Sequence, residues 1–398
     1  MSSRAARRLL PLIVLAAASM ALFWFAPAYV DNDMNRVLTT PPPAAAADAQ
    51  ALHAQLFVAD LHADQLLWAR DPLARATRGH VDVPRLRDGN VALQVFSVVT
   101  KTPRGINYDS NTDETDNILL LAIAQRWPIA TWRSLRARAL HQANRLHDAA
   151  KRSAGELVVV KTRGALDTLV AQRAAGKTVL GGVLAIEGLH ALDGVLANVD
   201  TLYDAGYRMM GLTHFFDNEL GGSAHGVSHG GLTPFGRDVV RRMETLGIIV
   251  DLAHTSPQMK RDVLGMATRP VVVSHGGVAA TCPGPRNLTD DELRAIAANG
   301  GIVGIGYWDG AVCEMSVPSI VRAMRHAVTI MGVDHVALGS DFDGATIEPW
   351  DTRALALLTE GLLRDGFSPD DVRRIMGGNV LALLQRQLPT TAGHSTGR

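Results

Sequence analysis

The sequence predicts a (β/α)8 barrel, and three features of the chain support this prediction. Eight short apolar runs alternate with helix-like stretches, and five of those runs end in a side chain that can bind a metal. No glycine-rich phosphate turn follows the first run, as an open doubly wound sheet would require; His62-Ala63-Asp64 stands there instead. Barrels of this class place their active sites at the carboxyl ends of the strands. Buried carboxylates and imidazoles that converge on one rim require a cation.

The expected strands are runs rich in Val, Ile and Leu, as in buried parallel strands. They are Leu56–Ala59, Val91–Val99, Leu180–Ile186, Arg208–Thr213, Ile248–Leu252, Pro270–Val273, Ile302–Ile305 and His335–Leu338. Helix start signals fall between them. A capping box begins at Thr289, and Pro257 and Pro369 each occupy a first helical position after a serine. The stretch 116–179 contains more helix than a single crossover needs.

The bulk composition limits the classes of function. With 398 residues, 47% of them hydrophobic, the chain can bury a large core. Its formal net charge is zero, so nothing indicates a nucleic-acid-binding protein, which would need a basic stripe. The two cysteines exclude a disulfide-dense scaffold and a four-cysteine zinc site.

The first 30 residues are expected to be a targeting segment. Three arginines within the first eight residues precede the uncharged run Leu9–Val30, which is long enough to cross about 30 Å of hydrocarbon. Two alternatives stay open. Ala26-Pro27-Ala28 resembles the cleavage site of a secretory signal peptide, whereas the length of the run favours an uncleaved signal anchor. In both cases the rest of the chain is exported.

The remaining chain divides into a Pro/Ala-rich linker over residues 31–50, a barrel over 51–388 and a flexible tail over 389–398. Export also affects Cys282 and Cys313, because disulfides persist in oxidising compartments. A bond between them would close a loop of about 30 residues and contribute roughly 3–4 kcal/mol. Two buried free thiols are the alternative.

Five candidate ligands follow the apolar runs. His62 and Asp64 are separated by one residue, so in an extended strand both point to the same face. Glu187 offers two oxygens that can bridge two ions, and His254 and His275 lie one β-α unit apart. Five ligands are too many for one catalytic zinc that keeps an open position, so two ions with a shared bridge fit better.

These motifs, taken together, resemble the membrane dipeptidase (renal dipeptidase) family of zinc peptidases in the amidohydrolase superfamily. The matching segments run in family order over residues 52–387. They are Asp60-Leu61-His62-Ala63-Asp64, Val83-Pro84-Arg85-Leu86-Arg87-Asp88-Gly89, Ile186-Glu187-Gly188, Leu212-Thr213-His214, Val250-Asp251-Leu252-Ala253-His254, Ser274-His275, Pro285-Arg286-Asn287 and Gly339-Ser340-Asp341-Phe342-Asp343-Gly344.

The resemblance implies two Zn²⁺ ions per chain. His62, Asp64 and Glu187 would hold the first ion, and Glu187, His254 and His275 would hold the second. A hydroxide that bridges the ions would attack the peptide carbonyl.

The resemblance also implies three roles in substrate binding and catalysis. Asp341 would accept the proton of the water and pass it to the departing amine. His214 would polarise the carbonyl and stabilise the oxyanion. Arg286 would bind the free carboxylate of a dipeptide through its guanidinium fork. Asp343 and Gly344 are expected to shape the turn that aims Asp341.

The function expected from this resemblance is hydrolysis of dipeptides, including those with a C-terminal D-residue. A lactonase or an N-acyl-amino-acid deacylase on the same scaffold is the alternative, and a non-catalytic membrane-tethered binding protein is a third hypothesis. Because the apolar segment is N-terminal, the chain is expected to be a bacterial exported form. It would be anchored in the inner membrane facing the periplasm, or periplasmic or secreted after cleavage. The oligomeric state stays open, a homodimer included.

Three further histidines near the expected site are given smaller roles. His225 and His229 lie in the glycine-rich stretch 221–231, which could be a mobile lid over the site but is predicted to be a surface loop. His190 follows Glu187 closely and is expected to support the ligands or begin a helix. Tyr307-Trp308, which ends the seventh strand, could wall the substrate pocket or simply pack in the core.

Overall fold

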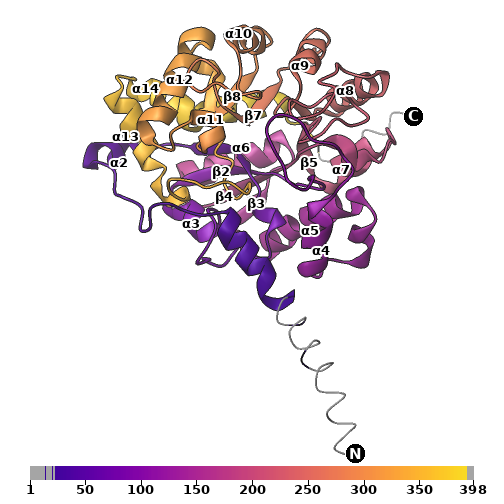
Figure 1. Cartoon of the computed structure of the whole chain (residues 1–398). Helices are drawn as coiled ribbons and strands as arrows, with labels where there is room; N and C mark the ends of the chain where they lie inside the picture. Colours follow the sequence, from indigo (N-terminus) through magenta and orange to yellow (C-terminus); the bar gives the residue numbers. More distant parts are fainter. Residues whose placement is uncertain (1–13, 15–19, 21–22, 392–398) are drawn as a thin grey trace, which may run out of the picture.

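The strands form a closed parallel barrel (Figure 1). The computed structural model describes residues 14, 20 and 23–391. Nine strands within these residues form one sheet in the order β2-β1-β9-β8-β7-β6-β5-β4-β3, and a pairing of β2 with β4 closes eight of them into a barrel. These eight are β1 (Val58–Ala63), β2 (Val91–Phe96), β4 (Leu180–Ile186), β5 (Tyr207–Gly211), β6 (Ile249–Asp251), β7 (Val272–Gly276), β8 (Ile302–Ile305) and β9 (Val336–Leu338). The predicted barrel is confirmed.

All residues of the eight barrel strands are buried, as expected for a parallel sheet covered by helices. Each strand overlaps a predicted run, but several boundaries differ. The first strand continues to Ala63, four residues beyond its predicted end, and therefore contains His62. The second strand ends at Phe96 instead of Val99.

The long stretch after β2 contains one strand that sequence reasoning did not predict. β3 (Leu157–Val159) pairs with the first half of β4, whose second half pairs with β5. The strand is only three residues long, too short for a hydrophobic period to be recognised. The same stretch contains α4 (Asn117–Ala124), α5 (Leu135–Arg152) and α6 (Arg163–Ala174), which confirms its expected helix content.

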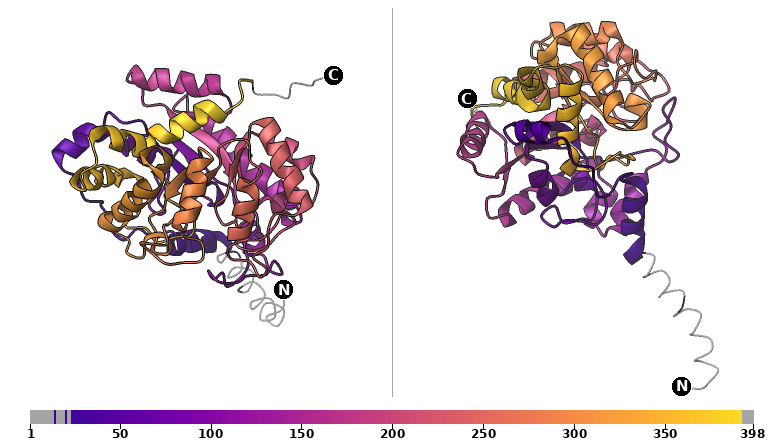
Figure 2. Two further views of the ribbon diagram at one scale, coloured as in Figure 1. Left: turned by 90° about the horizontal axis from the view of Figure 1, so that it is seen from above. Right: turned by 90° about the vertical axis from the view of Figure 1, so that its left-hand side faces the viewer.

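Helices surround the barrel, as both views in Figure 2 show. The remaining α-helices are α2 (Ala47–His53), α3 (Val83–Asp88), α7 (Asn198–Ala205), α8 (Pro234–Leu246), α9 (Pro257–Leu264), α10 (Asp290–Ala298), α11 (Asp309–Val312), α12 (Val317–Met331), α13 (Ala356–Arg364), α14 (Pro369–Arg373) and α15 (Asn379–Gln387). Short 3₁₀ turns are η1 (Gln65–Leu67), η2 (Ile129–Trp132), η3 (Leu189–Leu192), η4 (Val333–His335) and η5 (Thr352–Ala354), and η6 (Arg374–Gly378) is a π-helical turn.

The predicted helix starts are confirmed. The Thr289 side chain accepts a hydrogen bond from the Glu292 amide, and the Glu292 carboxylate accepts one from the Thr289 amide, so the capping box is complete. Ser368 and Asp371 form a second capping box at α14, whereas the Ser256 side chain caps α9 by accepting a hydrogen bond from the Met259 amide. Each serine directly precedes a proline. These caps satisfy amides that a helix leaves unpaired at its first turn.

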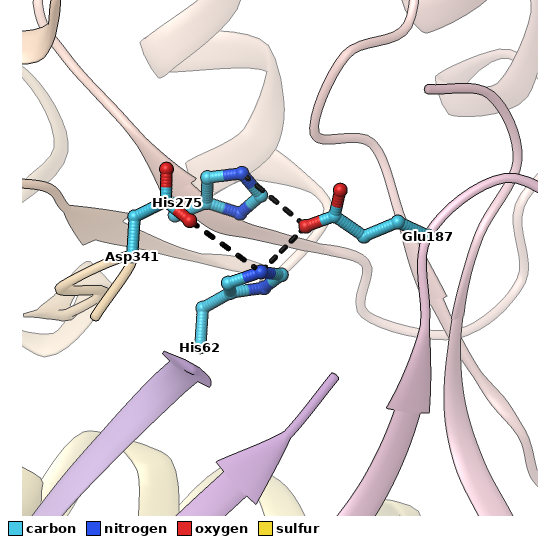
Figure 3. Close-up of side chains that lie close together, drawn as sticks. All are labelled: His62, Glu187, His275 and Asp341. Atoms are coloured by element: carbon cyan, nitrogen blue, oxygen red, sulfur yellow. Dashed lines mark ion pairs between the residues drawn. The ribbon is translucent and has the colours of Figure 1, made fainter. Parts of the chain in front are cut away.

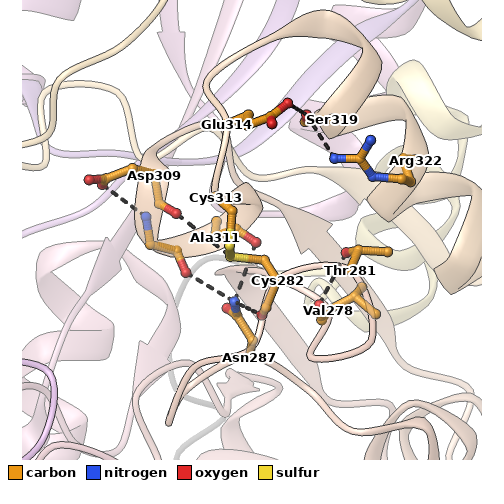
Figure 4. Close-up of a disulfide and its surroundings, with 11 residues drawn as sticks. Val278, Thr281, Cys282, Asn287, Asp309, Ala311, Cys313, Glu314, Ser319 and Arg322 are labelled. Atoms are coloured by element: carbon orange, nitrogen blue, oxygen red, sulfur yellow. Dashed lines mark hydrogen bonds between the residues drawn. A yellow bond between two sulfur atoms is a disulfide. The ribbon is translucent and has the colours of Figure 1, made fainter.

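Cys282 and Cys313 form a disulfide, as the first of the two alternatives predicted (Figure 4). Cys282 lies in the loop after β7, and Cys313 follows α11. The side-chain amide of Asn287 donates to the carbonyl oxygens of Cys282 (2.8 Å) and Gly310 (3.0 Å). The disulfide and these hydrogen bonds therefore fix the loop that carries Arg286.

The N-terminal part differs from the expected linker. Residues 23–34 are helical, and α2 packs against α13. Asp31 and Asn35 are buried at one end of the segment 31–50, and Ala45 and Ala49 are buried at the other, whereas most residues between 36 and 44 are exposed. The segment is therefore packed at both ends. Asp31 and Asn35 precede the Pro/Ala tract and bind partners in the barrel, described below.

Most of the predicted targeting segment lies outside the described residues, as do residues 392–398 of the predicted tail. Within the part of the chain that the structure describes, no helix has the length and apolar character needed to cross a membrane.

Candidate metal centre

The carboxyl ends of the barrel strands bring the predicted ligands together. His62 lies in β1 and His275 in β7, whereas Glu187 directly follows β4. The other candidates are Asp64 after β1, His214 after β5, His254 after β6 and Asp341 after β9. All seven side chains are buried. Because the strands are parallel, their ends meet at one rim, as predicted for this fold.

Glu187 lies at the centre of the cluster, and each of its two oxygens faces two imidazoles. Its Oε1 lies 2.5 Å from His62 Nε2 and 3.6 Å from His275 Nε2. Its Oε2 lies 2.6 Å from His214 Nε2 and 3.6 Å from His254 Nε2. Figure 3 shows the imidazoles of His62 and His275 pointing toward the same oxygen. Each oxygen of Glu187 can therefore face a different ion. The contacts of 2.5 and 2.6 Å are direct, so a bound ion would have to separate these atoms to the roughly 3.3 Å of two ligands on one zinc.

Two groups of potential ligand atoms share Glu187. One group contains His62, Glu187, His275 and Asp341, and the other contains Glu187, His214 and His254. The predicted ligand sets divide the histidines differently, since they pair His254 with His275 and leave His214 for the substrate.

Two further distances agree with the predicted ligand sets. Two ligands on one tetrahedral zinc ion lie roughly 3.3 Å apart when each zinc–nitrogen bond is about 2.0 Å. The Nε2 atoms of His254 and His275 are 3.1 Å apart, and His62 Nε2 lies 3.5 Å from Asp64 Oδ2. Both pairs therefore have the spacing of neighbours on one ion.

Several buried atoms of the cluster have no hydrogen-bond partner among the described residues. They include Asp64 Oδ1, His214 Nδ1 and His254 Nδ1. Leaving such groups unpaired in the interior costs about 1–3 kcal/mol each, and more for charged groups. Imidazole nitrogens and carboxylate oxygens are ligands that zinc accepts. The residues present therefore fit the binding of divalent metal ions.

The electrostatics of the cluster separate its acids from its bases. Burial raises the pKa of Glu187, but the charges of His214 and His62 outweigh this effect and hold that pKa well below its usual value. Burial also lowers the pKa of His254 and of His275 well below the ordinary value. Burial lowers the pKa of His62 as well, but the charges of Glu187 and Asp64 outweigh this effect and hold that pKa well above its ordinary value. Glu187 is therefore ionised and His254 and His275 are neutral, as metal binding requires, whereas a metal would have to displace the proton of His62.

Asp341 is the exception among the carboxylates. Burial raises its pKa well above the ordinary value, and the charges of Asp64 and Glu187 raise it further, against the opposing effect of His62. Asp341 Oδ1 lies 3.8 Å from His62 Nε2. A carboxylate that accepts a proton readily and lies beside the ligands suits a general base.

The loop that carries Asp341 has a strained backbone. Asp341, Asp343 and Ala345 have φ of 63°, 63° and 60°, in the left-handed region that costs non-glycine residues energy and often marks functional sites. A Cβ on Gly344 would lie 2.1 Å from Asp341 Oδ1, so only glycine fits there.

Asp343 holds this loop in place. Its carboxylate accepts hydrogen bonds from the amides of His80 (2.6 Å) and Val81 (3.2 Å), and it pairs with Arg70 at 2.7 Å. These contacts agree with the predicted role of Asp343 in aiming Asp341.

Arg286 lies beside the metal ligands and is buried despite its position in a Pro/Gly loop. It donates a hydrogen bond to the carbonyl oxygen of His275 at 3.1 Å, and its guanidinium lies 5.0 Å from the ring centroid of Trp308. Trp308 also lies close to His275, with ring centroids 5.9 Å apart. Stacking on an aromatic ring orients a guanidinium while leaving its remaining donors available.

A cavity of about 590 Å³ opens onto this cluster. Seven of the predicted residues line it: Asp64, Glu187, His214, His254, His275, Arg286 and Asp341. Tyr108 and Trp68 line it as well, and sequence reasoning did not select them. Tyr108 belongs to a loop without a periodic pattern, and long-range contacts place it at the cavity, among them the hydrogen bond that its hydroxyl accepts from Trp308 Nε1 (3.1 Å).

The secondary histidines have distinct environments. His225 is fully buried, with its ring centroid 5.4 Å from that of His254, so the prediction of a surface loop is wrong for this residue. The reason is a long-range contact between His225 Nδ1 and the carbonyl oxygen of Tyr108 at 2.8 Å. His229 is exposed, as predicted. His190 lies 2.9 Å from the Thr100 hydroxyl, and burial lowers its pKa to about 3.

Comparison with known proteins places the chain in one protein family. A sequence model of the membrane dipeptidase family (peptidase family M19) matches residues 46–393. The dipeptidase aclJ of Aspergillus oryzae is 30% identical over 322 residues, which is 77% of this chain and 69% of that protein. An uncharacterised protein of Klebsiella pneumoniae, encoded in the pqqA 5′ region, is 33% identical over 229 residues, or 54% of this chain and 84% of its own length.

Solved structures share the fold. A dipeptidase of peptidase family M19, dipeptidase AC, is 25% identical with a TM-score of 0.70, covering 84% of this chain and 99% of its own. A metallopeptidase from Rhodobacter sphaeroides, solved with a phosphinate mimic of the dipeptide L-Ala-D-Ala, has a TM-score of 0.70 and 24% identity, covering 83% and 99%.

Proposed function

The chain belongs to the membrane dipeptidase family, and we propose that it is a two-zinc enzyme that hydrolyses dipeptides. The observation that carries this proposal is the position of Glu187, whose two oxygens each face two imidazoles at the rim of the barrel. One ion would be held by His62, Asp64 and Glu187, and the other by Glu187, His254 and His275. The ions would supply a nucleophile by lowering the pKa of water and would polarise the scissile carbonyl.

Asp341 would transfer the proton, and His214 would stabilise the charge that develops during the reaction. Asp341 would accept a proton at its carboxylate and deliver it to the nitrogen of the departing amine. His214, whose Nε2 faces Glu187 at 2.6 Å, would stabilise the negative charge that develops on the carbonyl oxygen. Both side chains line the cavity, where a substrate can reach them.

Tolerance of a C-terminal D-residue is part of the proposal. A metallopeptidase of the same fold binds a mimic of L-Ala-D-Ala, which motivates the test for this chain. The measurement is kcat/KM for L-Ala-L-Ala and L-Ala-D-Ala. Cleavage of the L,L dipeptide alone would refute the proposed tolerance and leave the dipeptidase assignment intact.

Arg286→Ala is expected to raise KM for L-Ala-L-Ala roughly 10- to 100-fold, because the loss of a charge-assisted hydrogen bond costs about 1.5–3 kcal/mol. KM for the same dipeptide with a C-terminal amide should change much less, since the amide offers no charge to the guanidinium. Steady-state kinetics on both substrates measure the difference.

Arg294→Ala is the matched control, because Arg294 lies on α10 and its side chain is 56% exposed. An equal rise in KM for the acid and the amide in Arg286→Ala would exclude a role for Arg286 in binding the carboxylate.

We propose that the protein is exported, either anchored in the inner membrane or released after cleavage. The apolar run 9–30 and the disulfide between Cys282 and Cys313 support this proposal, because disulfides persist outside the reducing cytosol. Cell fractionation, with the mass of the mature chain, distinguishes the anchored form from the cleaved form. Recovery of the intact chain in the cytosol would refute export.

A further inference from the structure

The helix formed by residues 23–34 packs against the barrel and reaches the active-site cavity. Figures 1 and 2 show this helix, in indigo, between the grey trace and the barrel. Ala26, Pro27, Val30 and Met34 line the same cavity as the candidate ligands. Pro27 is buried, although it belongs to a segment predicted to be a targeting signal. One side of the helix is therefore a wall of the candidate active site.

Specific polar contacts hold the C-terminal end of this helix. The carboxylate of Asp31 is buried and pairs with Arg70 at 3.0 Å and with Arg78 at 2.8 Å. Asn35 accepts a hydrogen bond from the amide of Ala345 at 3.0 Å and donates one to Asp31 at 3.0 Å. A buried carboxylate without such partners would be costly, so these contacts fix the helix in one position.

The same contacts connect the helix to the loop that carries Asp341. Arg70 pairs with Asp31 through Nε and with Asp343 through its terminal nitrogen, at 3.0 and 2.7 Å. At the other end of the helix, the guanidinium of Arg126 lies 4.7 Å from the ring centroid of Trp24. The helix is thus attached at both ends to elements that surround the cavity.

The part of the cavity beside the helix is largely apolar. Val30 packs against the small core cluster that contains Leu67, Trp68 and Ile118. These three side chains also line the cavity, together with Leu121 of α4. The polar groups that would bind the substrate backbone belong to the strand ends, so the part of the cavity beside the helix can receive an apolar side chain. The whole cavity, with a volume of about 590 Å³, lies in the usual size range of small-molecule binding sites.

We propose that the helix 23–34 is part of the substrate site, and that Pro27, Val30 and Met34 form one wall of an apolar subsite. This subsite selects dipeptides in which one residue has a large apolar side chain. The inference rests on the proposed dipeptidase function and extends it to the substrate class. It applies to the uncleaved chain, because cleavage at Ala26-Pro27-Ala28 would remove Pro27 from the helix. Burial of one such side chain is worth roughly a 10- to 100-fold preference in kcat/KM over alanine.

Val30→Trp, made in the full-length zinc-loaded chain, tests the subsite because the larger ring would fill it. The substrates are Phe-Ala, Ala-Phe and Ala-Ala. The wild type is expected to prefer one of the two phenylalanine dipeptides over Ala-Ala by roughly 10- to 100-fold. Val30→Trp should lower kcat/KM for that preferred dipeptide about tenfold more than for Ala-Ala.

Tyr29→Trp is the matched control, because Tyr29 neighbours Val30 on the same helix and is 73% exposed. Tyr29→Trp should leave the preference for a phenylalanine dipeptide over Ala-Ala unchanged. Val30→Ala provides a second variant in case the larger ring displaces the helix. By enlarging the subsite, it should raise kcat/KM for a tryptophan dipeptide relative to the phenylalanine one.

The outcomes distinguish the subsite from the proposed function. A wild type with equal kcat/KM for all three dipeptides would overturn the subsite. The subsite would also be overturned if Val30→Trp lowered kcat/KM equally for all three and Val30→Ala left the preference among aromatic dipeptides unchanged. A zinc-loaded wild type that hydrolyses none of them would instead overturn the dipeptidase function, and the subsite with it.

Discussion

Asp341→Asn is expected to bind zinc at the same stoichiometry as the wild type and to lose about 10²- to 10⁴-fold in kcat, the usual contribution of a general acid–base. Asparagine has nearly the same shape as aspartate but cannot accept a proton. The left-handed turn should persist, because Asp343 and Gly344 hold it and neither is changed. Metal analysis gives the zinc bound per chain, and steady-state kinetics on L-Ala-L-Ala give kcat for the same preparation.

Asp291→Asn is the control for this substitution, since the Asp291 side chain is 95% exposed on α10. It should match the wild type in both measurements. If Asp341→Asn kept wild-type kcat, Asp341 would have no role in proton transfer. If it instead lost its zinc, Asp341 would act chiefly as a ligand, consistent with its place in the group that contains His62 and His275.

Glu187→Ala is expected to lose both ions and, with them, all measurable hydrolysis. Each oxygen of Glu187 faces two imidazoles, so its removal takes one ligand from both ions and leaves buried histidines without a counter-charge. Because both ions lose the same ligand, we expect both to be lost together. Metal content per chain after dialysis against metal-free buffer measures it.

Glu219→Ala is the control for metal retention, because Glu219 is exposed in the loop after β5. It should retain two ions per chain. One ion held at full occupancy in Glu187→Ala would contradict a bridge, and would indicate that the two groups of ligands bind their ions independently.

The parts of the fold that sequence reasoning predicted depend on local patterns. Each barrel strand is a short apolar run, and each run has the burial that its composition indicates. The capping box at Thr289 also depends on residues three apart in the chain. The metal ligands were predictable because the end of a parallel strand fixes which residues meet at the rim.

The parts that sequence reasoning missed depend on contacts between distant segments. Asp31 belongs to a segment whose composition predicts a spacer, yet it is buried because Arg70 and Arg78 bind it. His225 lies in a glycine-rich stretch and is buried because the loop that contains Tyr108 packs over it. No periodicity or motif marks such pairs in a single sequence, so the wall of the cavity became visible only in the structure.

The central claim is that the chain hydrolyses dipeptides with two zinc ions that share Glu187. The most direct test is to remove metal from the full-length protein with a chelator and restore Zn²⁺ stepwise, measuring bound zinc and L-Ala-L-Ala hydrolysis at each step. The account predicts no hydrolysis without metal and full recovery when two ions are bound per chain. Hydrolysis that persists in the metal-free protein, or that reaches its maximum with a single bound ion, would contradict it.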